Sequence, residues 1–99
     1  MASPGSFYKK KIASYRIAMD WVGSLPATAS IAGVTVSSYD KNGNLDSSVI
    51  DLNTLGITGT QTTVKVQSGT VGDRYKLEFV MTADDGETVL ADDITMIIT

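Results

Sequence analysis

Apolar and polar residues alternate along most of the chain, and this two-residue period is typical of β-strands that bury one face. In residues 15–21 the odd-numbered positions are apolar, while Arg16 and Asp20 lie between them. The same alternation recurs over residues 62–67 and 75–81. No stretch shows the apolar period of about 3.6 residues that an amphipathic helix would need. The pattern therefore predicts an all-β protein.

Local breaks in the alternation predict where strands bend and turn. Residues 30–39 read as one strand whose apolar parity shifts at the Ala-Gly pair 32–33, which predicts a β-bulge. The Asp-Gly pair at 85–86 stands between two alternating runs and predicts a tight hairpin. The run that returns from this hairpin, residues 89–98, changes parity at the acidic pair 92–93, where we expect a further irregularity.

The strands and turns together predict a single immunoglobulin-like antiparallel β-sandwich. About seven short strands are separated by Gly, Pro, Asn and Asp at intervals of about ten residues, which is typical of this fold. The chain has 99 residues, enough for one domain. Residues 1–11 are polar and contain Pro4 and Gly5, so we expect a flexible N-terminal arm followed by the sandwich over residues 12–99. The expected core contains Ile17, Trp21, Val36, Val66, Leu77 and Phe79.

The composition excludes several classes of chemistry. The chain has no histidine and no cysteine, so it cannot form a Ser-His-Asp triad, a cysteine nucleophile or an ordinary zinc site from its own residues. Its formal net charge of −3 disfavours a general nucleic-acid or anionic-membrane surface. Lys9, Lys10 and Lys11 are interpreted as part of a solubilising arm, and the residues that follow are too interrupted for a signal peptide or a spanning helix. We therefore expect a protein without enzymatic activity, cofactor, nucleic-acid partner or membrane partner.

Residues 40–51, DKNGNLDSSVID, place oxygen-bearing side chains at a spacing close to that of a calcium-binding loop. These candidates are Asp40, Asn42, Asn44, Asp46 and Asp51. The pattern departs from an EF-hand loop because Leu45 occupies the position of the turning glycine and the flanking segments read as strands. The Asn-Gly pair at 42–43 favours a hairpin tip. We interpret the segment as a hairpin tip, with a weak calcium site as the alternative.

Two further stretches resemble reactive sites but favour turns. A phosphate-binding loop of the P-loop kind needs a Gly-Lys-Ser/Thr end followed by a helix, whereas SGTVG at 68–72 is followed by Asp73 and a strand. This stretch therefore predicts a turn that leads into a strand. Acidic side chains near the last hairpin offer paired carboxylates for acid–base chemistry, but this pattern is more typical of charged turns and sheet edges. They are Asp84, Asp85, Glu87, Asp92 and Asp93.

The order of these segments resembles that of small Ig-like proteins encoded by tailed phages and prophages. YRIAMDW is followed by IAGVTV and then by TTVKVQSGTVGDRYKLEFVMTADDGETVLADDITMII, so the resemblance covers residues 15–98. The middle segment, residues 40–56, is longer than in that pattern, and the turn at 68–72 has one glycine fewer. The matching positions are Tyr15, Asp20, Trp21, Ile31, Thr62, Thr63, Ser68, Gly69, Thr70, Gly72, Tyr75, Thr82, Gly86 and Ile94.

The resemblance implies a non-enzymatic virion structural or accessory protein, as a head, head–tail or tail component, and it provides no catalytic residues to transfer. The implied location is the virion, and the host cytoplasm during assembly. The implied partners are other virion proteins or further copies of the chain. The rival interpretation, from the sandwich alone, is a cell-surface adhesion or carbohydrate-binding domain, which would need tyrosines or Trp21 exposed in a row.

The C-terminal run ITMIIT, residues 94–99, has no charged residue and is rich in β-branched side chains. If this run forms a sheet edge, it can pair with a second copy of the chain and make a homo-oligomer. The alternative is a central strand in which Ile94, Met96 and Ile98 face inward.

Overall fold

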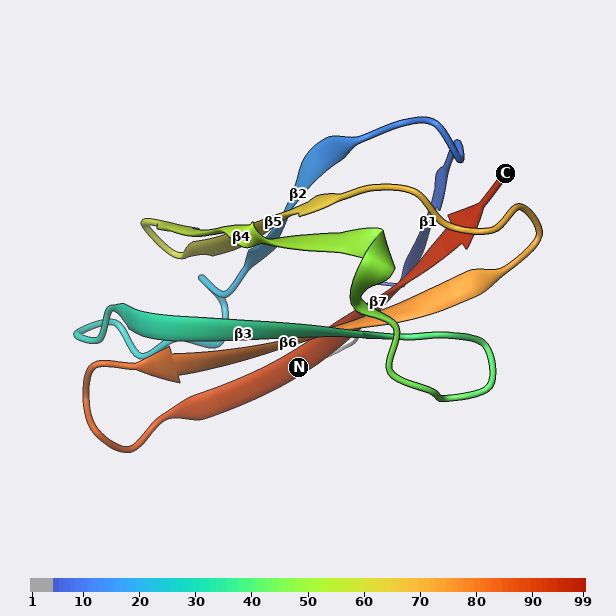
Figure 1. The fold of residues 1–99 in the computed structure, drawn as a ribbon. Coiled ribbons are helices and arrows are strands. Elements are labelled where there is room, and N and C mark those ends of the chain that lie inside the picture. The colour runs from blue at the N-terminus through green and yellow to red at the C-terminus, as the bar shows by residue number, and fades with distance from the viewer. Residues whose placement is uncertain (1–4) are drawn as a thin grey trace.

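Two β-sheets face each other in the computed structural model, which describes residues 5–99 (Figure 1). The elements are β1 (Ser6–Lys9), β2 (Tyr15–Asp20), β3 (Ile31–Tyr39), the 3-10 helix η1 (Ser47–Val49), β4 (Ile50–Thr58), β5 (Gln61–Val66), β6 (Arg74–Ala83) and β7 (Val89–Ile98). One sheet has the strand order β1-β7-β6-β3 and the other has the order β2-β5-β4. Neighbouring strands are antiparallel except β1 and β7, which are parallel.

This topology confirms the predicted immunoglobulin-like sandwich. The orders β2-β5-β4 and β3-β6-β7 are those of strands B-E-D and C-F-G in an immunoglobulin domain. The strand that differs is β1, which pairs with β7. An immunoglobulin constant domain places its first strand beside strand B, which corresponds to β2 here.

The core between the sheets is built from the inward residues of the alternating strands. Trp21 follows β2 and is fully buried, and its indole Nε1–H donates to Thr62 Oγ1 at 3.0 Å. Burial of one large apolar side chain contributes about 1.5–3 kcal/mol, so this layer supplies most of the stabilisation. Of the predicted core residues, Ile17 is half-buried and packs against the buried core cluster. The buried ones are Trp21, Val36, Val66, Leu77 and Phe79.

The pairing registers confirm one predicted irregularity and contradict another. β3 and β6 shift register between Ile31 and Gly33, at the predicted bulge. β6 and β7 pair without interruption, so the irregularity expected at residues 92–93 is wrong. The ladder keeps its pleat, and Asp92 therefore points inward opposite Phe79. Its Oδ2 atom is buried and has no hydrogen-bond partner within residues 5–99.

The N-terminal segment differs from the predicted arm. Residues 6–9 form β1, which pairs in parallel with residues 95–98 of β7. Phe7 packs against the core, and Lys9 is only 2% exposed. The edge of β7 accounts for the difference, because its backbone amides and carbonyls need hydrogen-bond partners there. Residues 1–4 of the predicted arm lie outside the described residues.

β1 also decides between the two interpretations of the C-terminal run. Residues 95–98 lie between β1 and β6, so they are not a sheet edge. Met96 and Ile98 are buried and Ile94 packs against the core, as the central-strand alternative predicts. Residues 95–98 therefore have no free strand edge for the homo-oligomer that was expected to form there.

Candidate interaction surface

Three loops and the C-terminus lie together at one end of the sandwich, which we name the loop end (right-hand side of Figure 1). It comprises residues 10–14 between β1 and β2, residues 40–46 between β3 and η1, residues 67–73 between β5 and β6, and Thr99. The first loop is tied to the C-terminus, because Lys11 N donates to Thr99 O at 3.2 Å. The loop end therefore unites segments that are distant in sequence.

The 68–72 stretch forms a turn with unusual backbone angles. Ser68 has a φ of 54° and Gly69 a φ of 104°, both in the left-handed region. A Cβ atom on Gly69 would lie 2.7 Å from the Cδ1 and Cγ1 atoms of Ile98. Glycine is therefore needed at position 69 for space as well as for its backbone conformation.

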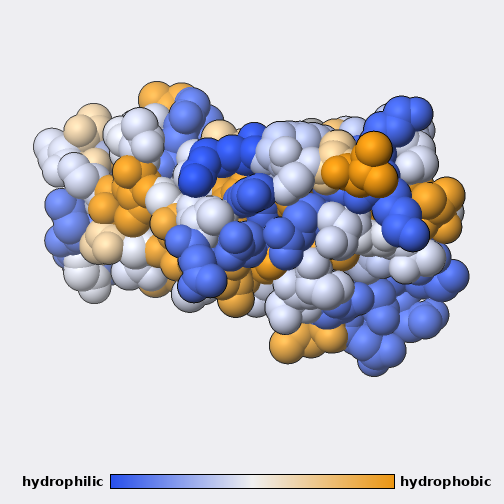
Figure 2. Space-filling view, turned by 45° about the horizontal axis from the view of Figure 1, so that its top comes forward, coloured by the Kyte–Doolittle hydropathy of each residue, from blue (hydrophilic) through white to orange (hydrophobic). Residues whose placement is uncertain are grey.

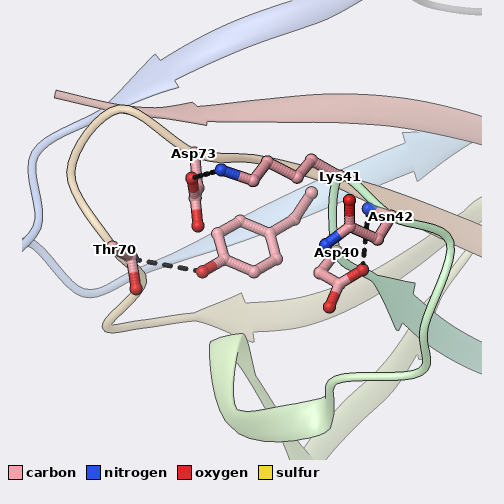
Figure 3. A network of polar contacts seen from close by, with 6 residues as sticks. Asp40, Lys41, Asn42, Thr70 and Asp73 are labelled. Carbon is pink, nitrogen blue, oxygen red and sulfur yellow. Dashed lines mark hydrogen bonds and ion pairs between the residues drawn. The ribbon is translucent and has the colours of Figure 1, made fainter.

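Internal hydrogen bonds use the amide groups that an anion would require in this turn. Thr70 N donates to Tyr75 Oη at 3.1 Å, as the dashed line from Thr70 shows (Figure 3). Gly72 N donates to Ile98 O at 3.0 Å, and Asp73 N donates to Thr70 O at 3.0 Å. These bonds favour a rigid turn over a phosphate-binding loop, because an anion site needs amides that are free to point at the ligand.

Lys9 connects β1 to this turn through a buried ammonium group. Its Nζ donates to the carbonyl oxygens of Ser68 at 2.7 Å, Lys10 at 2.9 Å and Lys11 at 3.3 Å. Burial removes the ammonium from water and lowers the pKa of Lys9. The predicted solubilising role is therefore wrong for Lys9, whereas Lys10 and Lys11 are exposed.

A salt bridge joins the turn at 40–46 to the turn at 67–73. Lys41 Nζ lies 3.0 Å from Asp73 Oδ1, so the lysine side chain spans the space between the two turns (Figure 3). An ion pair as exposed as this one contributes only about 0–1 kcal/mol to stability. The pair shows that the two turns are neighbours but contributes little to holding them together.

The predicted hairpin tip is a turn at a crossing between the sheets. Asp40 Oδ1 accepts a hydrogen bond from Asn42 N at 2.9 Å (Figure 3) and another from Asn44 N at 3.0 Å, which closes residues 40–44. A single bridge between β3 and Leu45 follows, and the chain then passes through η1 into β4 of the other sheet. Asp40 N donates to Asn44 O and Asp46 N donates to Ser38 O, both at 2.8 Å, so the Asn-Gly pair makes the expected hairpin tip, although β3 and β4 themselves belong to different sheets.

The other calcium candidates are also used by their own backbone. Asp46 Oδ1 caps η1 by accepting from Ser48 Oγ at 2.6 Å and Ser48 N at 3.0 Å, and these bonds, the hydroxyl first, lower the pKa of Asp46. Asp51 Oδ1 accepts from Asn53 N at 3.1 Å. Residues 5–99 contain no group of three or more acidic side chains that could hold a metal ion together.

Each loop of the loop end exposes one large apolar side chain. Ile12 is 95% exposed, Leu45 is 69% exposed and Val71 is 60% exposed. Hydrophobic residues on the face visible in Figure 2 form separate patches between hydrophilic ones. A partner that covers such side chains gains the free energy of removing apolar surface from water. Sequence reasoning missed these residues, although an apolar residue inside a polar turn and outside the alternating pattern is a readable signal.

The acidic side chains of the last hairpin also bond within their surroundings. Asp85 accepts from Thr88 Oγ1 at 2.6 Å, Thr88 N at 2.8 Å and Glu87 N at 2.9 Å, and these bonds, the hydroxyl first, lower its pKa. Asp84 Oδ1 accepts from Ser30 N at 2.9 Å, which ties the hairpin to the start of β3. The structure encloses no pocket within the described residues. These carboxylates therefore organise the hairpin and its neighbour.

A family model described as Podophage GP4 fiber-tail adaptor protein gp77 matches residues 9–96. The matched segment contains all of β2 to β6 and most of β7. No curated protein and no solved structure matches the chain. Within residues 5–99, no helix has the length and apolar character to cross a membrane.

Proposed function

Because the chain belongs to the family of the podophage GP4 fiber-tail adaptor protein gp77, we propose that it is a non-enzymatic structural connector between a fibre and the tail of a phage particle. The family match carries this proposal, because it spans nearly the whole sandwich from residue 9 to residue 96. The match also confirms the resemblance to phage structural proteins that the sequence shows. The proposed location is the virion, after assembly in the host cytoplasm.

We assign the contact with a neighbouring virion protein to the loop end. Its three exposed apolar side chains, Ile12, Leu45 and Val71, come from three different loops and give the surface apolar anchors. The same three loops also expose the lysines at positions 10 and 11 and polar residues of the turns. Apolar anchors within a polar rim are the usual composition of a protein interface, because the rim shields the anchors from water.

The rigidity of the loops supports the same assignment. The Lys9 ammonium group and the Tyr75 hydroxyl bond to the turn at 67–73, Lys11 N ties the first loop to Thr99 O, and Asp40 closes the turn at 40–44. A loop that is ordered before binding loses less conformational entropy when a partner covers it. The loop end thus suits permanent contacts in an assembled particle.

The rival function, a cell-surface adhesion or carbohydrate-binding domain, gains little from the structure. Trp21 is fully buried and cannot stack on a sugar. Tyr8 and Tyr15 are exposed but belong to different sheets. This arrangement lacks the row of exposed aromatic rings on which the rival interpretation depends.

The proposal is tested by incorporation into particles. The wild-type chain, Ile12→Asp and the control Val22→Asp are each supplied to a phage that lacks its own copy, and mass spectrometry measures the chain relative to tail proteins in purified virions. Val22 is 67% exposed and follows β2 at the opposite end of the sandwich. Val22→Asp therefore makes the same change from an exposed apolar to an acidic side chain, away from the loop end. Circular dichroism checks that both variants fold.

We expect virions that contain the wild-type and Val22→Asp chains and virions that lack Ile12→Asp. Absence of the wild-type chain from purified virions would contradict the proposed function as a whole. Equal incorporation of the two variants would contradict only the assignment of the contact to the loop end.

A further inference from the structure

The outer edge of β2 is open in a place where an immunoglobulin domain carries a strand. β5 covers one edge of β2, and no strand within residues 5–99 pairs with the other. In an immunoglobulin constant domain the first strand lies beside strand B, but here β1 pairs with β7. An open strand edge is a template for pairing with another chain, because its amides and carbonyls lack protein partners.

Against strand addition β2 carries only the exposed charges of Arg16 and Asp20, whereas the other sheet edges carry further protection. The register of β4 is interrupted between Asp51 and Gly56, and β1 has only four residues. Part of the β3 edge is bridged by Leu45, and the uncovered half of β7 contains the inward-pointing Asp92. β2 pairs with β5 in continuous register and contains no proline, glycine or lysine. Interruptions, short strands and inward charges are the usual protection of edges, so β2 is the least protected.

Alternate residues of β2 present their backbone groups to this open edge. Trp21 N donates to Thr60 O at 2.9 Å, so residues of its parity direct their amides and carbonyls toward β5. Arg16, Ala18 and Asp20 have the opposite parity, and all three are exposed. Their amides and carbonyls therefore point outward, in the plane of the sheet.

We propose that two copies of this chain pair through antiparallel β2 strands, with Ala18 opposite Ala18 of the second copy. This register places Arg16 opposite Asp20 of the second copy on the outer face of the sheet, and it does so twice because the pairing is two-fold symmetric. It also places Ile17 opposite Met19 of the second copy on the inner face. Charge complementarity selects this register, because opposite charges across a strand pair stabilise it and like charges destabilise it.

The guanidinium group of Arg16 is already held on the outer face of the sheet. Its Nη1 donates to Thr54 O at 2.7 Å and to Thr63 Oγ1 at 3.1 Å. Gly56 leaves room for this contact, because a Cβ atom there would lie 2.9 Å from Thr63 Oγ1 and 3.7 Å from Nη1. These acceptors lie on β4 and β5, away from the open edge, so the side chain turns toward the edge when its N–H donors meet a carboxylate of the second copy.

Asp20 is a suitable acceptor for those donors. Its Oδ1 atom accepts from Thr60 Oγ1 at 2.9 Å and Val22 N at 3.0 Å, while Oδ2 receives only a long contact of 3.5 Å from Gln61. The pKa of Asp20 is lowered, first by the Thr60 hydroxyl and then by the Val22 amide, so the carboxylate is charged at neutral pH. The pairing buries little surface, which predicts a reversible dimer.

This inference does not depend on the proposed adaptor function, because it concerns a different surface and is tested with the purified chain. Sedimentation velocity over a concentration series measures the dissociation constant of the wild-type chain, of Arg16→Glu and of Asp20→Lys. Each single variant places two like-charge pairs in the interface and is expected to weaken the dimer about tenfold or more. An equimolar mixture of the two variants restores opposite charges at both positions and is expected to dimerise like the wild type.

A wild-type chain that stays monomeric to its solubility limit, or a mixture that associates no better than its components, would overturn the proposal. Because Arg16→Glu also removes contacts within the sheet, a second test avoids charge changes. Ala18→Cys should form an intermolecular disulfide on mild oxidation, since paired Cα atoms about 5.5 Å apart lie within disulfide range. Ala32→Cys, an equally simple change at an exposed position of edge strand β3, is the matched control. Equal crosslinking of the two variants would overturn the register.

Discussion

The buried hydrogen bond between Trp21 and Thr62 gives the sharpest test of what stabilises the buried face of the β2-β5-β4 sheet. Both side chains are fully buried, and the indole Nε1–H donates to Thr62 Oγ1 at 3.0 Å. Thr62→Val removes the hydroxyl but keeps the branched shape, so the indole N–H loses its acceptor while the volume of the core is retained. A buried donor without a partner costs about 1–3 kcal/mol. We therefore expect Thr62→Val to lower the free energy of unfolding by that amount, out of a total of about 5–15 kcal/mol.

A double-mutant cycle separates the hydrogen bond from the packing. Trp21→Phe also leaves the Thr62 hydroxyl unpaired, and in addition it creates a cavity. In the Thr62→Val background no polar group is left unpaired by the tryptophan change, so only the packing loss remains. The two changes should therefore be non-additive by about 1–2 kcal/mol, within the range seen for residues in contact.

The assay is urea denaturation followed by far-ultraviolet circular dichroism, because the chain has one tryptophan and Trp21→Phe removes the fluorescence probe. Thr35→Val, at an exposed position of β3, is the control and should change the free energy of unfolding by no more than about 0.5 kcal/mol. Additive effects of the two core changes would refute the reasoning, because they would show that the indole and the hydroxyl do not depend on each other.

Three further predictions concern the turns and the buried lysine. Gly69→Ala should destabilise the fold more than Gly43→Ala, measured by thermal unfolding, because both positions have positive φ but only Gly69 meets side-chain atoms at 2.7 Å. Asp85→Asn should reduce the loss of stability on acidification. A lowered carboxyl pKa gives stability that is present above the ordinary value of 3.8 and is lost as the pH falls through the folded value. An unchanged dependence of stability on acidic pH would contradict this. For Lys9 the sign is the same but the window is alkaline: between its lowered folded pKa and 10.5 the unfolded chain binds more protons, so this group makes stability rise with pH, and Lys9→Met should abolish that rise in alkaline urea titrations.

The strands with strict alternation could be predicted because their pattern is local. In β2 and β6 every second residue is apolar, and the pleat alone sends those residues to one side. The bulge near Gly33 was also readable, since one extra residue in a strand shifts the parity and glycine tolerates the backbone angles that a bulge requires. The same logic failed at Asp92, because a charged residue was assumed to face solvent. The uninterrupted ladder with β6 overrides that preference and turns the side chain inward.

The candidate site depended on contacts that no local pattern encodes. Lys9 looks like its exposed neighbours in the sequence, and only the nearness of the Ser68 carbonyl accounts for its burial. Ile12, Leu45 and Val71 can each be singled out in the sequence as a large apolar residue within a polar loop, but no local pattern places the three together. Their common location follows from the topology, which brings three loops to one end of the sandwich.

The unusual place of β1 connects the two surfaces to which we assign partners. Because β1 runs parallel to β7, its last residue reaches the loop end, where the Lys9 ammonium group binds the Ser68 carbonyl. Because β1 pairs with the edge of β7, it cannot pair with β2, and the outer edge of β2 stays open. One strand position therefore both orders the loop end and leaves the charged edge of β2, with Arg16 and Asp20, free for a second copy. If a variant moved β1 away from β7, both properties should change together: the turn at Ser68 would lose its lysine contact, and β1 could compete with the second copy for the edge of β2. Phe7→Ala removes the apolar side chain that anchors β1 to the core, so it should weaken both the lysine contact at the turn and the dimer. Amide exchange at the turn and the dimer dissociation constant, measured on that variant, should then rise together, and a change in only one of them would show that β1 does not link the surfaces.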